Sequence, residues 1–116
     1  MAEYSVTGFL PLGNSIAITG ATSAPTAIQA PSNAALQTSS NQQFRVVNSG
    51  TNTAFLGVGA TAAAALANAV LITSSQAAIP MLPGSVEILS FPMNSYFTAL
   101  TASGSAVVYI TPGQGL

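Results

Sequence analysis

Residues 43–58 have the sequence QFRVVNSGTNTAFLGV. In an extended chain with a side-chain period of two, Phe44 and Val46 share one face. The connecting NSGTN is made of small and polar residue types, among which Gly and Asn accept the backbone angles of tight turns. We therefore predict two strands, residues 43–48 and 53–58, that pair as a β-hairpin.

The same pattern returns after Pro83 and Gly84, a pair that is typical of turns. Three further runs rich in alternating apolar and β-branched side chains follow, at residues 85–91, 96–101 and 105–111. Because short connections join them, we predict a three-stranded meander in which each strand pairs with the next.

The first 40 residues and the Ala-rich segment carry weaker signals. Short β-compatible runs at residues 4–10, 15–19 and 26–29 are separated by Gly and Pro. Residues 33–41 are small and polar, which indicates a loop. Residues 60–69 are compatible with a short helix or with a loop.

Seven to eight short strands in a chain of this length predict an all-β fold. We expect an antiparallel β-sandwich with jelly-roll-like topology. A chain of 116 residues is long enough for one core, so we expect a single domain over residues 1–116. The weak patterning of residues 1–35 favours an extended N-terminal arm.

Charge is scarce in this chain: only 3% of the residues are charged, against about 25% in ordinary soluble domains. Glu3, Arg45 and Glu87 are the whole set, and there is no His, Lys, Asp or Cys. This composition excludes Ser–His–Asp triads, Cys–His dyads, Schiff-base lysines and zinc sites built from His or Cys. A single arginine cannot neutralise a series of phosphates, which excludes nucleic-acid binding. We predict a chain that is not an enzyme and holds no cofactor or metal ion.

Glu3 and Glu87 are the one pair of carboxylates that a glycosidase mechanism would have available. Glu3 lies close to the N-terminus and Glu87 in a predicted strand, and exposed carboxylates are mostly solvated, so we favour a solvated state for both. For Arg45 two alternatives stay open. One is a cross-strand ion pair with Glu87, which would contribute about 0–1 kcal/mol, and the other is a solvated side chain.

Residues 57–62, GVGATA, match the G-x-G-x-x-A pattern of dinucleotide-binding loops. In that fold the glycines let the backbone approach a pyrophosphate at the N-terminus of a helix. The acidic residue expected about 20 positions later is missing, since Met81, Leu82 and Pro83 occupy that region. We therefore interpret the glycines as a strand end or bulge.

No part of the sequence is suited to crossing a membrane. The most apolar window, residues 60–72, is shorter than the roughly 20 residues that a spanning helix needs. The N-terminus lacks the basic start and apolar run of a secretory signal, so we expect synthesis in the cytoplasm. The net charge of −1 leaves little repulsion between copies, which favours an oligomer or a larger assembly.

Several aromatic, Met and Leu residues near predicted turns have the composition of an interface core. These candidate interface residues are Phe9, Met81, Leu82, Phe91, Met93 and Tyr96. The alternative is that they fill the core of the domain itself, because a thin sandwich needs its few large side chains inside.

Residues 44–59, 79–89 and 107–115 together resemble small virion proteins of tailed bacteriophages. The shared features are a strand, a compact Asn/Gly turn, a second strand, a strand led by Pro-Gly, and a final strand that ends in a Pro-Gly tail. These features are mostly turn chemistry, and residues 1–42 add nothing to the resemblance.

This resemblance implies a capsid decoration, or cement, protein. Such a protein is a β-sandwich on the outside of the phage head that bridges neighbouring subunits of the major capsid protein. The expected location is the exterior of the virion, and the expected form is a homo-oligomer, either a dimer or a trimer. The resemblance brings no catalytic residues with it.

Two other classes of protein stay open. A tail-fibre or receptor-binding module of the virion would also be a β-sandwich, with exposed aromatic and polar side chains for a sugar or a surface partner. An ice-binding protein would share the scarcity of charge, but it should show regularly spaced ranks of Thr, and the Thr spacing here is irregular.

Overall fold

The computed structural model of the protein describes residues 10–11, 13–30, 41–72 and 78–114. These residues form mostly strands, with one short helix. The strands are β1 (Leu10–Pro11), β2 (Ile16–Gly20), β3 (Ile28–Gln29), β4 (Asn41–Asn48), β5 (Ala54–Gly59), β6 (Ile79–Met81), β7 (Val86–Pro92), β8 (Tyr96–Thr101) and β9 (Ala106–Gln114), and the helix is α1 (Ala62–Asn68).

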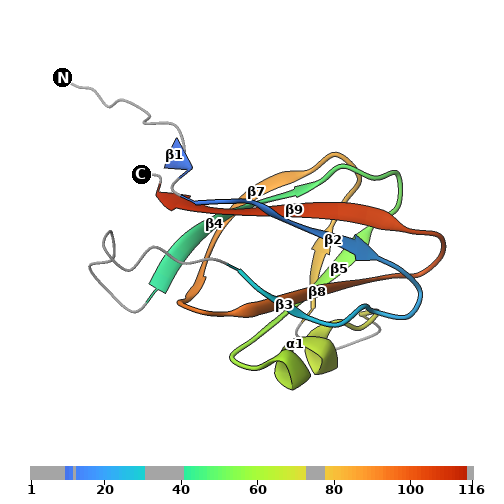
Figure 1. The fold of residues 1–116 in the computed structure, drawn as a ribbon. Coiled ribbons are helices and arrows are strands. Elements are labelled where there is room, and N and C mark those ends of the chain that lie inside the picture. Colours follow the sequence, from blue (N-terminus) through green and yellow to red (C-terminus); the bar gives the residue numbers. More distant parts are fainter. Residues whose placement is uncertain (1–9, 12, 31–40, 73–77, 115–116) are drawn as a thin grey trace.

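The strands form two sheets, here called sheet A and sheet B. Sheet A has the order β1-β9-β4-β7, and β2 also pairs with β9; sheet B has the order β3-β8-β5-β6. All of these strand pairs are antiparallel. The sheets lie as two layers, with α1 on the outer side of sheet B (Figure 1). The prediction of a mostly β, antiparallel fold is confirmed, and its architecture is sandwich-like.

The pairing of consecutive strands differs from the prediction in two places. β4 pairs with β7 and β9, whereas β5 pairs with β6 and β8, so the hairpin predicted for residues 43–58 is wrong. The predicted meander is also wrong, because β7 and β9 belong to sheet A and β8 belongs to sheet B. The physical reason is that a loop rich in Gly and Asn suits a crossing between sheets as well as a hairpin. An alternating apolar pattern requires only that one face of each strand point to the core, and it does not specify the neighbouring strand.

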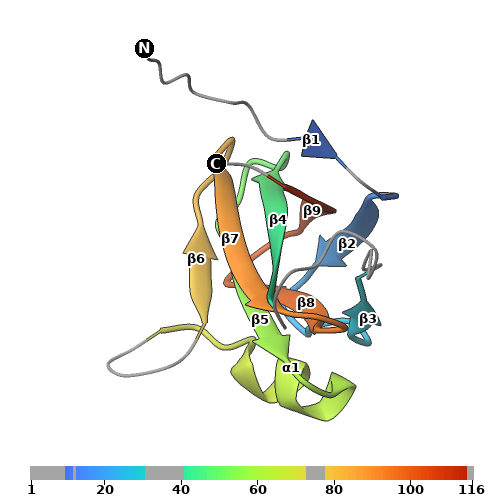
Figure 2. The same ribbon diagram turned by 90° about the vertical axis from the view of Figure 1, so that its left-hand side faces the viewer.

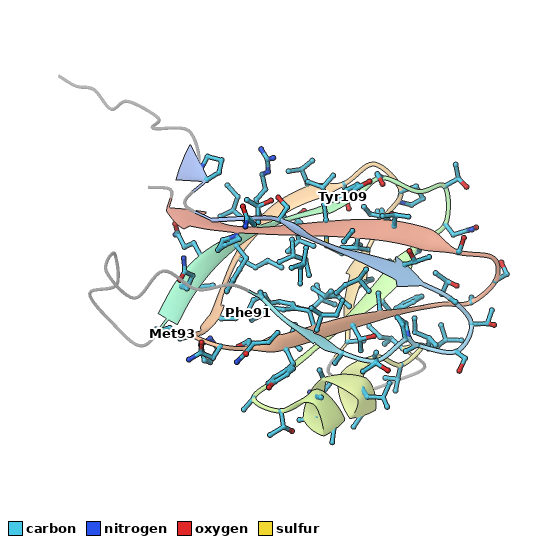
Figure 3. All side chains as sticks on the ribbon, in the orientation of Figure 1. Phe91, Met93 and Tyr109 are labelled. Carbon is cyan, nitrogen blue, oxygen red and sulfur yellow. The ribbon has the colours of Figure 1, made fainter. Side chains whose placement is uncertain are left out.

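Three phenylalanines form the aromatic centre of the core. The ring centroids of Phe44 in β4 and Phe97 in β8 are 5.2 Å apart, and those of Phe91 in β7 and Phe97 are 5.5 Å apart. Both pairs are close to the edge-to-face geometry that aromatic rings favour. Phe91 lies between the two layers (Figure 3). Because Phe44 and Phe91 belong to sheet A and Phe97 to sheet B, this cluster joins the sheets.

The Ala-rich segment contains the helix, so of its two predicted alternatives the helix is correct. Thr61 caps α1, since its Oγ1 accepts a hydrogen bond from the backbone N–H of Ala64 at 3.1 Å. β6 is not among the predicted strands because Pro80 lies at its centre, and proline counts against a strand. It is an edge strand of sheet B, where a missing N–H is tolerated.

Part of the segment predicted as an arm belongs to the domain. β2 pairs with β9 over five residues, and β3 pairs with β8. The arm expected over residues 1–35 therefore does not include residues 16–30. Residues 1–9 and 31–35 lie outside the described residues, as do most of the strand predicted at 4–10 and of the loop predicted at 33–41.

Asn48, the last residue of β4, ties the two sheets together through hydrogen bonds. Its side chain is buried, and its Nδ2 donates to the backbone oxygens of Met81 in β6 and of Asn52, each at 2.8 Å. Its Oδ1 accepts a hydrogen bond from the N–H of Gly50 at 2.9 Å. Its backbone N–H and C=O bond to the turn that leads into β7. A single residue thus holds the crossing loop, the edge of sheet B and the start of β7.

The substitution Asn48→Asp tests this role, because it keeps the size of the side chain and removes both of its donors. We expect the free energy of unfolding, measured by urea denaturation, to fall by about 3 kcal/mol or more, since each buried unsatisfied group costs about 1–3 kcal/mol. The matched control is Asn52→Asp, which removes one exposed hydrogen bond to the Ser105 carbonyl and should cost about 1 kcal/mol. Equal losses in the two variants would contradict the assignment.

Candidate interaction surface

The glycines of residues 57–62 allow the helix to pack closely on β5. A Cβ on Gly57 would lie 2.5 Å from the backbone N of Ala69, and closer still to the carbonyl oxygen of Ala65. A Cβ on Gly59 would lie 2.5 Å from the backbone N of Ala65. Both glycines are among the last three residues of β5, which agrees with the strand-end interpretation. The backbone of α1 therefore occupies the space next to these glycines.

The two charged residues that the structure describes lie on different faces of sheet A. Arg45 pairs in register with Ile88, and Glu87 pairs with Val46. Val46 is buried in the core, so Glu87 lies on the inner row of β7, while Arg45 lies on the outer face. Glu87 is exposed there because β7 is at the edge of the sheet. Glu3 lies outside the described residues.

Among the residues described, no three His, Cys, Asp or Glu side chains gather into a group that could hold a metal ion. The described part of the chain also contains no helix that is long and apolar enough to cross a membrane.

The candidate interface residues do not gather into one surface. Phe9 lies outside the described residues. Met81 is 1% exposed and belongs to the core, and Phe91 packs against that core. Leu82 precedes β7 and is 62% exposed, whereas Met93 and Tyr96 follow β7 and are half-buried. The seven-residue length of β7 therefore separates Leu82 from Met93 and Tyr96.

An apolar row on the outer face of sheet A is absent from the predicted set. Tyr109 of β9 pairs in register with Ala17 of β2 on one side and with Val47 of β4 on the other, and Val47 pairs with Val86 of β7. The row Ala17, Tyr109, Val47 and Val86 therefore crosses four strands of the sheet, and we call it the outer row. Figure 3 shows Tyr109 on the side of sheet A that faces away from sheet B.

Exposure sets the outer row apart from the core-facing side of the sheet. Val86 is 56% exposed and Tyr109 is 43% exposed. The next row of cross-strand partners on the same face is Thr111, Arg45 and Ile88. In that row Ile88 is 47% exposed. Large apolar side chains in a contiguous exposed group are typical of an interaction site.

A signal for this surface was available in the sequence. Val46 and Val47 are adjacent, so they point to opposite faces of the strand, and both are apolar. In β7, Val86 and Ile88 lie on one face. Leu89 and Phe91 lie on the opposite face and pack against the core. A strand with apolar side chains on both faces, as in β7, indicates a sheet that is covered on both sides.

No protein-family model matches the sequence, and no curated protein and no solved structure matches it. The fold itself defines the class of protein: a small, sandwich-like all-β protein.

The substitution Gly57→Ala tests the close packing of α1 on β5. The added methyl group must displace the backbone of α1, and overpacking of this kind costs about 1–3 kcal/mol. We expect a corresponding drop in the free energy of unfolding from urea denaturation. The exposed helical substitution Ala67→Ser serves as the control and should stay within about 0.5 kcal/mol of the parent chain. If Gly57→Ala were as stable as the parent, the proximity of α1 and β5 would be contradicted.

Proposed function

We propose that this protein is a structural component of a bacteriophage virion that binds the outside of the head and stabilises the major capsid protein, as a decoration or cement protein. The observation that carries the proposal is the outer row: a contiguous apolar surface on a chain with 3% charged residues. A protein with so few titratable side chains is suited to binding through shape, hydrogen bonds and apolar contact. The same scarcity supports a role without catalysis.

We also propose that the topology is a jelly roll. From β2 to β9 the chain passes between sheets A and B at every step except from β5 to β6. The orders β2-β9-β4-β7 and β3-β8-β5-β6 fit two facing four-stranded sheets built from two Greek keys. Jelly rolls are frequent in viral capsid proteins, which supports the virion assignment by analogy of fold alone.

Stabilisation of the head would follow from mass action. A protein that binds the assembled shell and has no affinity for free subunits shifts the equilibrium toward the shell. The outer row is the surface that we assign to this contact, because Tyr and Val side chains contribute most of their binding energy through desolvation.

A hollow beside sheet B favours a second candidate function, a tail-fibre or receptor-binding module. It has a volume of about 460 Å³. Its lining includes Phe55, Pro80 and Leu82 together with the polar Asn52, Thr53 and Ser103. An aromatic ring beside amide and hydroxyl groups suits a sugar, which has apolar faces and hydroxyl edges. Electron microscopy of particles carrying the labelled protein separates the two functions, because one places the label on the head and the other on the tail.

The substitution Tyr109→Lys tests the outer row. We expect binding to purified heads that lack the protein to weaken at least about tenfold, because a central aromatic anchor is replaced by a charge. The matched control is Ile28→Lys in sheet B, which adds the same charge at a residue of similar exposure, 41% against 43%. Occupancy of the heads, measured by quantitative gel densitometry, should be unchanged by the control. Equal losses would contradict the assignment of the surface.

Attachment to heads should depend weakly on ionic strength. Raising the salt concentration from about 0.1 M to 1 M shortens the Debye length from about 10 Å to about 3 Å, which weakens exposed charge pairs and leaves apolar contacts in place. We expect the occupancy after centrifugation of the particles to change by less than about twofold. Release of the protein by 1 M salt alone would argue for an electrostatic attachment instead.

A further inference from the structure

The edge of sheet A formed by β7 differs from the other sheet edges that the structure describes. β3 has two residues, β6 has three with Pro80 at its centre, and β2 has five. β7 has seven residues, with its proline at the last position. Natural edge strands are usually short or interrupted, since a long continuous edge pairs readily with another strand. In Figure 2, β7 lies along the margin of sheet A next to β4.

The direction of the β7 backbone groups follows from its pairing with β4. The backbone N–H of Asn48 donates to the carbonyl of Ser85 at 3.1 Å, so Asn48 directs its backbone toward β7. The N–H and C=O groups of successive residues point to opposite sides of a strand, so those of Val46 also point toward β7, to its partner Glu87. The intervening residues of β7, Val86, Ile88 and Ser90, therefore direct their N–H and C=O groups toward the free edge.

We infer that β7 pairs antiparallel with β7 of a second copy of this chain, so that sheet A continues across a two-fold axis. The register that we assign is centred on Ile88, which faces Ile88 of the partner subunit. Val86 then faces Ser90 of the partner subunit, and each of these pairs joins residues whose backbone groups point to the free edge. The pairing is isologous, with the same residues on both sides of the axis.

Charge supports a second copy as the occupant of this edge. The whole chain has a net charge of −1, so two copies meet with little repulsion. The one charged residue of β7 is Glu87, and an axis through Glu87 would place two carboxylates directly opposite each other, which is destabilising. The axis at Ile88 instead places Glu87 opposite Leu89 of the partner subunit. The charge of Glu87 therefore counts against the register centred on it and is compatible with the register centred on Ile88.

The paired edges also bring apolar surface together. Val86 and Ile88 are 56% and 47% exposed, and they belong to the same face as Tyr109 and Val47. In the dimer the two outer rows lie on one continuous face of the joined sheet. Pairing of one edge strand buries less surface area than the roughly 800 Å² per partner of a standard interface. The dimer should therefore dissociate on dilution. This inference does not depend on the proposed role in a virion.

Sedimentation equilibrium of the purified full chain tests the dimer. With rising protein concentration we expect the mass to increase from 11.5 kDa toward twice that value. Ile88→Lys places two like charges at the axis and should raise the dissociation constant at least about tenfold. Leu66→Lys in α1 is the matched control, with the same added charge and 48% exposure against 47% for Ile88, and it should leave the constant unchanged. A wild-type chain that stays monomeric at all concentrations, or equal effects of the two substitutions, would overturn the inference.

Single-cysteine variants test the register and stay informative if Ile88→Lys fails to fold. The chain has no native Cys, so Ile88→Cys and Val86→Cys each carry one thiol. At the axis the two Cα atoms of position 88 are about 5.5 Å apart, within the range of a disulfide, whereas those of position 86 are about 14 Å apart. Mild oxidation should therefore cross-link Ile88→Cys much faster than Val86→Cys. Equal rates, or faster cross-linking of Val86→Cys, would overturn the register and the two-fold pairing.

Discussion

The hydrogen bonds of Asn48 are the constraint on which the arrangement of the sheets depends. All three side-chain bonds and both backbone bonds of this buried residue go to segments that follow it in the chain: the crossing loop, the end of β6 and the turn before β7. Buried polar groups without partners are costly, so these bonds stabilise the geometry in which all of them are made. That geometry carries the chain away from sheet A into sheet B at the end of β4.

The crossing from sheet to sheet also determines which surfaces remain for function. Because most neighbours in sequence lie in different sheets, each sheet is assembled largely from strands that are distant in sequence, such as β4 and β9. The aromatic cluster takes the inner faces of both sheets, and α1 covers part of the outer side of sheet B. The outer face of sheet A is left with its apolar row. In a chain with 3% charged residues, this exposed apolar row is the surface on which the proposed function rests.

Most of the strands could be located from the sequence, but their pairing partners were predicted wrongly. Period-two alternation marks β4, β5, β7, β8 and β9 because a half-buried strand must place apolar residues on one face. The loop after Asn48 contains turn residues whether it forms a hairpin or crosses the core, so pairing cannot be derived from it. The candidate interface residues are dispersed for a related reason: residues close to turns, such as Leu82 and Met93, are separated in space by the strand between them.

The sequence by itself determined that the protein is mostly β and that charged side chains are scarce, because composition and side-chain period are local properties of the chain. Tertiary structure alone decided which strands pair, which of the two apolar faces of β7 is buried, and that a helix packs against Gly57 and Gly59. These outcomes depend on contacts between residues far apart in sequence. Such contacts are selected by the shared burial of side chains and by the satisfaction of polar groups such as those of Asn48, which no local pattern encodes.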